Sequence, residues 1–167
     1  STLLLTLFAF LYFLVGCILL YPIMAFMMLP FADIKKRKYW FHWTMMVFSK
    51  SLIYIMANVK KEFANKHNID FSKSSVIIAN HHSFLDIMLL LTVNPKIVMV
   101  TNKWVYNSPF FGRSVRFADF ILAEQGVVTK VEHVNSLIRD GYSIMIFPEG
   151  TRSRTANLGR FHKGAFY

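Results

Sequence analysis

The first 32 residues of this chain lack every residue type that carries charge. No Asp, Glu, Lys, Arg or His occurs between Ser1 and Ala32, and Asp33 is the first charged residue. A helix needs roughly 20 apolar residues to cross a bilayer, so this segment is long enough to do so. The segment has no basic stretch before it and no clear cleavage site, which argues against a signal peptide. We therefore expect it to contact a membrane.

Cysteine and acidic residues are also scarce. Cys17 is the only cysteine, which excludes a disulfide framework and a cysteine-based metal site, and we expect no metal. Nine Asp and Glu stand against 19 Lys and Arg, giving a net charge of +10. No nucleic-acid motif accompanies this charge, so we do not expect a nucleic-acid partner. A basic surface also suits an acidic acyl carrier or a phosphorylated substrate.

A basic run at Lys35–Lys38 directly follows the apolar segment. Cations in this place meet anionic head groups and indicate that this end of the segment faces the cytoplasm, although a solvated charge run is the alternative. We predict helices over residues 2–29 and 39–57, with a kink or break near Pro22. The two helices form either a hairpin or one spanning and one interfacial helix. The aromatic second helix could instead pack on the globular domain.

From residue 60 the chain turns polar, and strand-like and helix-like segments then alternate. Strands are predicted over 75–79, 96–101, 119–123 and 142–147, and helices over 83–93, 108–118 and 130–140, the last ended by Gly141. This order predicts an α/β fold, a mostly parallel sheet flanked by helices. We therefore expect two domains: membrane-associated helices over 1–59 and an α/β domain over 60–167.

Two polar clusters follow predicted strands. "NHHSFLD" at 80–86 comes after the first strand, and "FPEGTRSR" at 147–154 comes after the fourth. In open α/β sheets, ligands bind beyond the carboxyl ends of the strands. The shared placement of the two clusters therefore predicts a single site.

The first cluster offers several candidates for chemistry. Asp86 could orient His81 from the first turn of the helix and leave the other ring nitrogen as a base. His82 and Asp86, at helical i, i+4 spacing, are a competing pair. Ser83 is a competing nucleophile, but it lacks the strand–turn–helix "G-x-S-x-G" setting of an esterase, and it is also a candidate helix cap.

The second cluster has the residue types of an anion site. Gly150 permits close approach of the backbone, and Thr151, Arg152 and Arg154 supply hydroxyl and guanidinium donors that match phosphate. The alternative is an ordinary basic loop in which an arginine pairs with Glu149.

Together the two clusters resemble the first and third signature blocks of the glycerolipid acyltransferases, the family of 1-acylglycerol-3-phosphate acyltransferases. That family has N-H-x-S-x-x-D and F-P-E-G-T-R-S in the same order. "NKWVYNSPFFG" at 102–112 resembles its second block, and "GRFHKGAFY" at 159–167 resembles its F-K-x-G-A-F stretch. The resemblance covers about residues 74–167 and is highly specific as a set.

The resemblance implies an enzyme, a membrane-bound acyltransferase of phospholipid biosynthesis with its active domain on the cytoplasmic face. It would move an acyl chain from acyl-CoA or acyl-ACP to the hydroxyl of a lysophospholipid, foremost 1-acylglycerol-3-phosphate, without a further cofactor. His81 would be the general base and Asp86 its partner. The implied phosphate-binding residues are Lys103, Glu149, Gly150, Thr151, Arg152 and Arg154.

Two departures from the family pattern keep alternatives open. Gln125 stands where the second block has an arginine, which would fit another acceptor, such as a lyso-aminolipid or glycerol-3-phosphate. The chain stops at Tyr167, before the family's fourth block, so we expect the α/β domain to be truncated at its C-terminal end. A non-catalytic lipid-binding membrane module is the alternative from another class of function.

Overall fold

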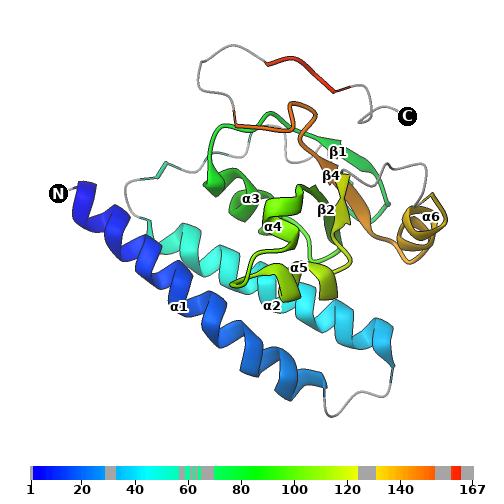
Figure 1. Cartoon of the computed structure of the whole chain (residues 1–167), viewed down its shortest axis with the longest axis horizontal. Helices are drawn as coiled ribbons and strands as arrows, with labels where there is room; N and C mark the ends of the chain where they lie inside the picture. The colour runs from blue at the N-terminus through cyan, green and yellow to red at the C-terminus, as the bar shows by residue number, and fades with distance from the viewer. Residues whose placement is uncertain are drawn as a thin grey trace. The chain divides into compact units, whose positions relative to one another are not determined.

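A computed structural model of the chain shows long helices first and a small sheet afterwards (Figure 1). It describes residues 2–28, 33–56, 59–60, 62, 64, 70–123, 131–152 and 159–162. The chain divides into two compact units, one of residues 1–70 with 87–95 and one of residues 71–86 with 96–167. The domain boundary at residues 59 and 60 stays a prediction.

The first unit contains a helical hairpin. Helix α1 spans Thr2–Met28, and α2 spans Ile34–Ile55 and runs back along it (Figure 1). The ring of Phe48 stacks with the rings of Tyr12 and Phe13, with centroids 5.9 and 6.1 Å apart. The hydroxyls of Tyr12 and Ser51 lie 2.7 Å apart in a hydrogen bond. Of the arrangements predicted for the two helices, the structure therefore has the hairpin.

The ends of these helices differ from the sequence prediction. Helix α2 begins at Ile34 rather than at residue 39, because Asp33 caps it and its carboxylate accepts a 2.8 Å hydrogen bond from the Lys35 N–H. The basic run therefore lies within the start of α2. Of the kink or break predicted near Pro22, the break is wrong, since α1 continues through this proline to Met28, and the kink stays a prediction. A proline removes a single backbone hydrogen bond, and the turns on either side keep the others.

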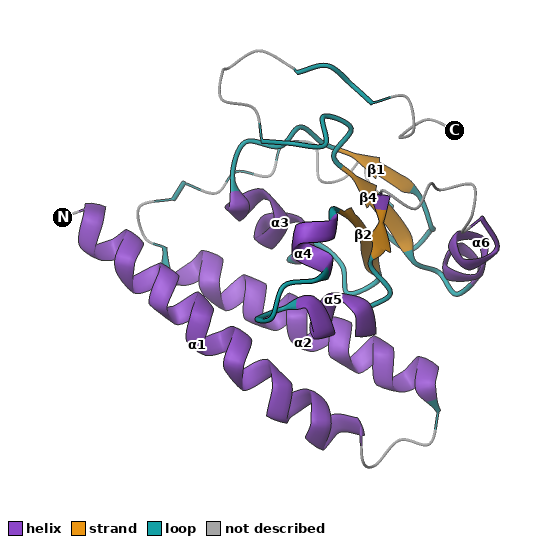
Figure 2. Ribbon diagram, in the orientation of Figure 1, coloured by secondary structure: helices purple, strands orange, loops and turns teal. Residues whose placement is uncertain are grey.

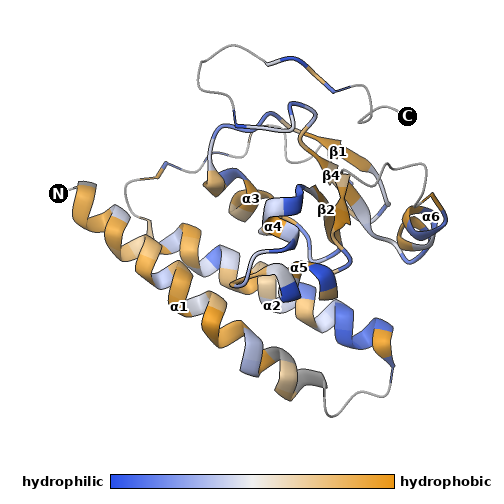
Figure 3. Ribbon diagram, in the orientation of Figure 1, coloured by the Kyte–Doolittle hydropathy of each residue, from blue (hydrophilic) through white to orange (hydrophobic). Residues whose placement is uncertain are grey.

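Helix α1 exposes apolar side chains along most of its length. Figure 3 shows it almost entirely in the hydrophobic colour, and Leu3, Phe10 and Ile18 each expose about two thirds of their surface. By length and composition alone, Leu3–Ile23 is a segment of 21 residues that could cross a membrane. The exposure distinguishes α1 from the core helix of a soluble protein, which would bury these side chains.

The second unit contains a parallel sheet of four strands in the order β1-β4-β2-β3. The strands are β1 (Val76–Ile78), β2 (Ile97–Thr101), β3 (Ile121–Leu122) and β4 (Ser143–Ile146). Val76 pairs with Ile144, Ile97 with Ser143 and Val100 with Ile121. The central strands are buried as continuous apolar runs, typical of parallel sheets. The predicted parallel α/β fold is confirmed.

Short helices connect the strands (Figure 2). They are α3 (Phe84–Leu91), α4 (Lys103–Tyr106), α5 (Gly112–Phe117) and α6 (Val131–Arg139). A single helix was predicted over 108–118, but the helix in this region begins later, at Gly112. Asn102 caps α4, accepting a 3.0 Å hydrogen bond from the Val105 N–H, and α5 begins only at Gly112. Gly141, at φ 86°, follows the end of α6 as predicted.

Candidate active site

Three polar segments leave the sheet at the carboxyl ends of neighbouring strands. Residues 79–83 follow β1, residues 147–152 follow β4, and Asn102 with Lys103 follows β2. Strands β1 and β2 both pair with β4 in parallel, so these three ends meet at one edge of the sheet. This is the edge where open α/β sheets bind ligands, and it is where the sequence predicts the site.

A capping box at the start of α3 holds Asp86. The Ser83 hydroxyl accepts a 3.2 Å hydrogen bond from the Leu85 N–H, and Asp86 Oδ2 reaches back to accept from the Ser83 N–H at 2.7 Å. The same oxygen accepts from the His82 N–H, also at 2.7 Å. Ser83 is thus the helix cap, and backbone donors fix the position of the carboxylate.

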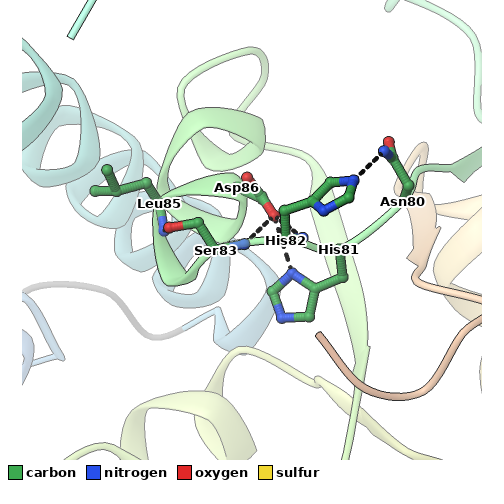
Figure 4. A network of polar contacts seen from close by, with 6 residues as sticks. All are labelled: Asn80, His81, His82, Ser83, Leu85 and Asp86. Carbon is green, nitrogen blue, oxygen red and sulfur yellow. Dashed lines mark hydrogen bonds and ion pairs between the residues drawn. The ribbon is translucent and has the colours of Figure 1, made fainter. Parts of the chain in front are cut away.

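His81 pairs with this carboxylate through one ring nitrogen (Figure 4). Its Nδ1 lies 3.1 Å from Asp86 Oδ2. Both side chains are largely shielded from solvent, since 14% of the His81 side chain and 29% of the Asp86 side chain are exposed. The His81 ring also stacks on Phe147, with centroids 4.2 Å apart and planes at 25°. With Nδ1 as the donor to Asp86, the imidazole carries its lone pair on Nε2, the arrangement of a general base.

The side chain of His82 points elsewhere. Its Nε2 accepts a hydrogen bond from the Asn80 amide at 2.8 Å, and only its backbone N–H contacts Asp86 (Figure 4). The side chain is also exposed to solvent. The structure therefore decides between the two predicted pairs: His81, and not His82, has its ring on Asp86.

The second cluster forms a tight loop after β4. The Gly150 N–H donates to the Phe147 carbonyl at 3.0 Å, and Gly150 has φ 65°, a conformation that favours glycine. Pro148 and Glu149 are buried, whereas Gly150, Thr151 and Arg152 are exposed. Because Phe147 contacts His81, this loop begins directly beside the candidate base.

The carboxylate of Glu149 faces the protein rather than solvent. It is only 5% exposed, and its Oε2 accepts a 2.9 Å hydrogen bond from the Gly159 N–H. Within the described ranges no ion pair joins Glu149 to an arginine, and Arg154 lies outside them, so the alternative of an Arg–Glu149 loop stays open. Among the described residues, Glu149 connects the loop to a later segment of the chain.

The remaining predicted residues have different positions. Lys103 is the first residue of α4, at the end of β2, and its side chain is exposed. Arg154 and Gln125 lie outside the described residues, as does the stretch 163–167. The binding roles of Lys103, Glu149, Gly150, Thr151, Arg152 and Arg154 stay predictions.

Two features of the site were missed from the sequence. One is Phe147, the first position of the third block, whose ring stacks on His81. Its aromatic side chain directly after a strand was the signal that could have indicated this contact. The other is the segment 159–162, which lies against Pro148–Gly150. Nothing local in the sequence indicates that contact.

No three His, Cys, Asp or Glu side chains among the described residues are grouped so as to hold a metal ion. The expected absence of a metal stays a prediction. The described residues supply a base, its carboxylate partner and nearby hydrogen-bond donors. That no cofactor is needed stays a prediction.

Comparison with protein families and known proteins shows which proteins this chain resembles. A family model described as Acyltransferase matches residues 36–167. A chloroplastic 1-acyl-sn-glycerol-3-phosphate acyltransferase of Arabidopsis thaliana is 31% identical over 96 residues, 55% of this chain and 27% of that protein. The 1-acyl-sn-glycerol-3-phosphate acyltransferase of Escherichia coli (strain K12) is 35% identical over 100 residues, 56% of this chain and 41% of that protein. The chain thus spans less than half the length of these relatives.

A solved structure shares the fold. It is the crystal structure of the 1-acyl-sn-glycerophosphate (LPA) acyltransferase PlsC from Thermotoga maritima, with a TM-score of 0.77 and 21% sequence identity. The match covers 99% of this chain and 67% of that protein. At this identity the likeness shows a common architecture.

Proposed function

This chain belongs to the Acyltransferase family, and we propose that it transfers an acyl chain from acyl-CoA or acyl-ACP to the hydroxyl of a lysophospholipid. The proposed acceptor is 1-acylglycerol-3-phosphate, and the reaction would serve phospholipid biosynthesis. The observation that carries the proposal is the His81–Asp86 pair, held by a capping box beside a loop with exposed hydroxyl and guanidinium donors. Relatives named as 1-acyl-sn-glycerol-3-phosphate acyltransferases support this acceptor.

In the proposed reaction, His81 Nε2 removes the proton from the acceptor hydroxyl while the oxygen attacks the thioester carbonyl carbon. The C–S bond then breaks, and the thiolate leaves and takes the proton from His81. Asp86 holds the ring in the correct tautomer and stabilises its protonated form. A general base contributes roughly 10²- to 10⁴-fold in rate, so positioning of both substrates must supply the remainder.

The loop after β4 would bind the anionic head of the acceptor. Arg152 presents a planar fork of donors that matches two phosphate oxygens, and Thr151 adds a hydroxyl. Lys103 would add a cation from the end of the neighbouring strand β2, with Arg154 as a further donor. Gly150 and Glu149 would shape the loop, since one has a positive φ and the other is buried.

Membrane association fits a lipid acceptor and is part of the proposal. Helix α1 has an exposed apolar surface of spanning length, and the basic residues Lys35–Lys38 begin α2 immediately afterwards. Cations at this place favour an anionic membrane surface and the cytoplasmic side. A hairpin that lies in the membrane interface keeps both the basic start of α2 and the catalytic unit on the cytoplasmic face, and this is the arrangement that we propose.

The proposal is tested by acyl transfer in the full-length protein, purified in detergent, with labelled acyl-CoA and 1-acylglycerol-3-phosphate. We expect His81→Ala to lower the rate by roughly 10²- to 10⁴-fold with an unchanged circular dichroism spectrum. His82→Ala is the matched control and should keep most of the activity, because its ring bonds only to Asn80. Full activity in His81→Ala would show that the base is assigned wrongly.

The acceptor is tested in the same assay. Gln125, in place of the family's arginine, favours a second candidate, an acceptor that lacks the phosphate, such as a lyso-aminolipid; glycerol-3-phosphate is a further alternative acceptor. Transfer to one of these but not to 1-acylglycerol-3-phosphate would establish it. A folded protein that binds lysolipid but transfers to no acceptor would instead support the non-catalytic module.

A further inference from the structure

We infer that the segment Gly159–His162 is a further part of the acceptor site, in which His162 binds the anionic head group and Glu149 positions the segment. The inference rests on the proposed function and adds a binding residue to it. It depends on three contacts between this segment and the loop after β4.

Two hydrogen bonds attach the segment at both of its ends. The Gly159 N–H donates to Glu149 Oε2 at 2.9 Å, and the His162 N–H donates to the Pro148 carbonyl at 2.8 Å. Residues 159 and 162 are therefore held against residues 148 and 149. These loop residues immediately follow Phe147, which stacks on the candidate base His81.

The third contact places the His162 ring over Gly150. A methyl group added at Gly150 would lie 3.0 Å from Cδ2 and 3.2 Å from Nε2 of His162. The imidazole thus occupies the space beside the glycine that opens the anion loop, next in the chain to Thr151 and Arg152. His162 itself is exposed, so a ligand at this loop can reach its ring nitrogens.

The charges of this surface suit a phosphate monoester. Arg152, Arg160 and His162 are exposed, while the one carboxylate of the loop, on Glu149, is buried and turned to Gly159. An imidazole donates a hydrogen bond in either protonation state and carries a positive charge in one of them. The phosphate of a lysolipid and the phosphates of coenzyme A share this chemistry, and the experiment below separates them.

Glu149 is built to hold the segment rather than to contact ligand. A Cβ added at Gly159 would lie only 2.6 Å from Glu149 Oε2, so the carboxylate packs directly on the glycine backbone. Its other oxygen, Oε1, is buried without a hydrogen-bond partner among the described residues. The contact with Gly159 is therefore the one that these residues give the carboxylate.

The first test compares His162→Gln with His162→Lys in the full-length protein. The KM for 1-acylglycerol-3-phosphate and the KM for the acyl thioester are measured separately, each at saturating second substrate. We expect His162→Gln to raise the acceptor KM by about 10-fold, the effect of losing one charge-assisted hydrogen bond, and to leave the thioester KM unchanged. His162→Lys, which supplies a cationic hydrogen-bond donor at this position, should recover most of the loss.

A rise in the thioester KM alone would assign His162 to binding of the acyl donor and overturn the inference. Unchanged values of both KM constants would also overturn it. These outcomes are distinct from failure of the proposed function. If the wild-type protein transfers no acyl chain, the proposed function fails, whereas wild-type transfer with no effect of His162 variants removes only the further inference.

The second test examines Glu149 as a positioning residue. Glu149→Ala should raise the acceptor KM to about the level of His162→Gln, and the double variant should be no worse than either single one, because both act through the same ring. Additive effects would contradict the inference. If Glu149→Ala fails to fold, Glu149→Gln is tested in its place. The amide oxygen of the new glutamine can still accept the hydrogen bond from the Gly159 N–H, so the acceptor KM should stay near the wild-type value.

Discussion

At the scale of single residues, Asp86 makes two kinds of contact from one position. As the third residue of α3, its carboxylate closes the capping box with Ser83, and the same oxygen pairs with the His81 ring. The geometry is therefore compatible both with a helix cap and with the proposed role of orienting His81. The motif N-H-x-S-x-x-D contains a capping box within it.

This double role predicts different effects for the two partners. Asp86→Ala should lower the rate of acyl transfer and also destabilise the protein by about 1–2 kcal/mol, because the backbone N–H groups of His82 and Ser83 lose their acceptor. His81→Ala should lower the rate with a smaller loss of stability, since its ring stacks on Phe147 but bonds to no backbone group among the described residues. Urea unfolding followed by circular dichroism, beside the transfer assay, measures both. Equal losses of stability in the two variants would contradict the cap.

At the scale of elements, the helical hairpin depends on a close approach at Gly16. The Cβ of any larger residue at this position would lie about 2 Å from the Phe48 ring, where Tyr12 and Phe13 also pack. Helix α1 therefore approaches α2 through a glycine facing an aromatic ring. The sequence of α1 shows no strong periodicity that would have revealed this face, because nearly every residue in it is apolar.

We predict that Gly16→Leu separates α1 from α2, because the new side chain cannot share the space of Phe48. The midpoint of thermal unfolding of the detergent-solubilised protein should fall by several degrees, since one badly overpacked contact costs about 1–3 kcal/mol. Ile18→Leu is the matched control, because Ile18 is 64% exposed and tolerates another apolar side chain. An unchanged midpoint in Gly16→Leu would show that this contact contributes nothing to stability.

At the scale of the whole molecule, charge is distributed very unevenly along the chain. The apolar α1 is followed by the cluster Lys35–Lys38, and the net charge of +10 belongs entirely to what comes after residue 32. A membrane protein with this pattern is held by its apolar helix and oriented by its cations.

The proposed membrane association predicts how the protein fractionates and orients. The full-length protein should stay in the membrane pellet in 1 M salt and in alkaline carbonate, because apolar burial rather than surface charge holds it. A cysteine introduced at the exposed Ser72 should react with an impermeant maleimide only from the cytoplasmic side. Replacing all four residues 35–38 with Gln, a good helix former, should leave the pellet fraction unchanged and mix the two orientations. Release of the wild-type protein by salt alone would remove the burial of α1 in the membrane from the proposal.

Much of this protein was determined by its sequence alone. The alternation of strands with helices, the parallel sheet and the placement of both polar clusters after strands follow from local apolar patterns, and the structure has them. The errors have other causes. Asp33 caps α2 before its apolar pattern begins, and Asn102 caps α4, a short helix that the pattern did not predict. At Pro22 the helix continues where a break was one of the predicted outcomes.

Only the tertiary structure decided how the site is assembled. The sequence placed two histidines near Asp86, and the direction of each ring showed that His81 pairs with it. Phe147 against His81 and His162 against Gly150 join segments that lie apart in the chain. Spacing along a chain limits which residues are neighbours within a turn or a helix. Contacts between separate segments depend on strand order and side-chain rotamers, which exist only once the chain has folded.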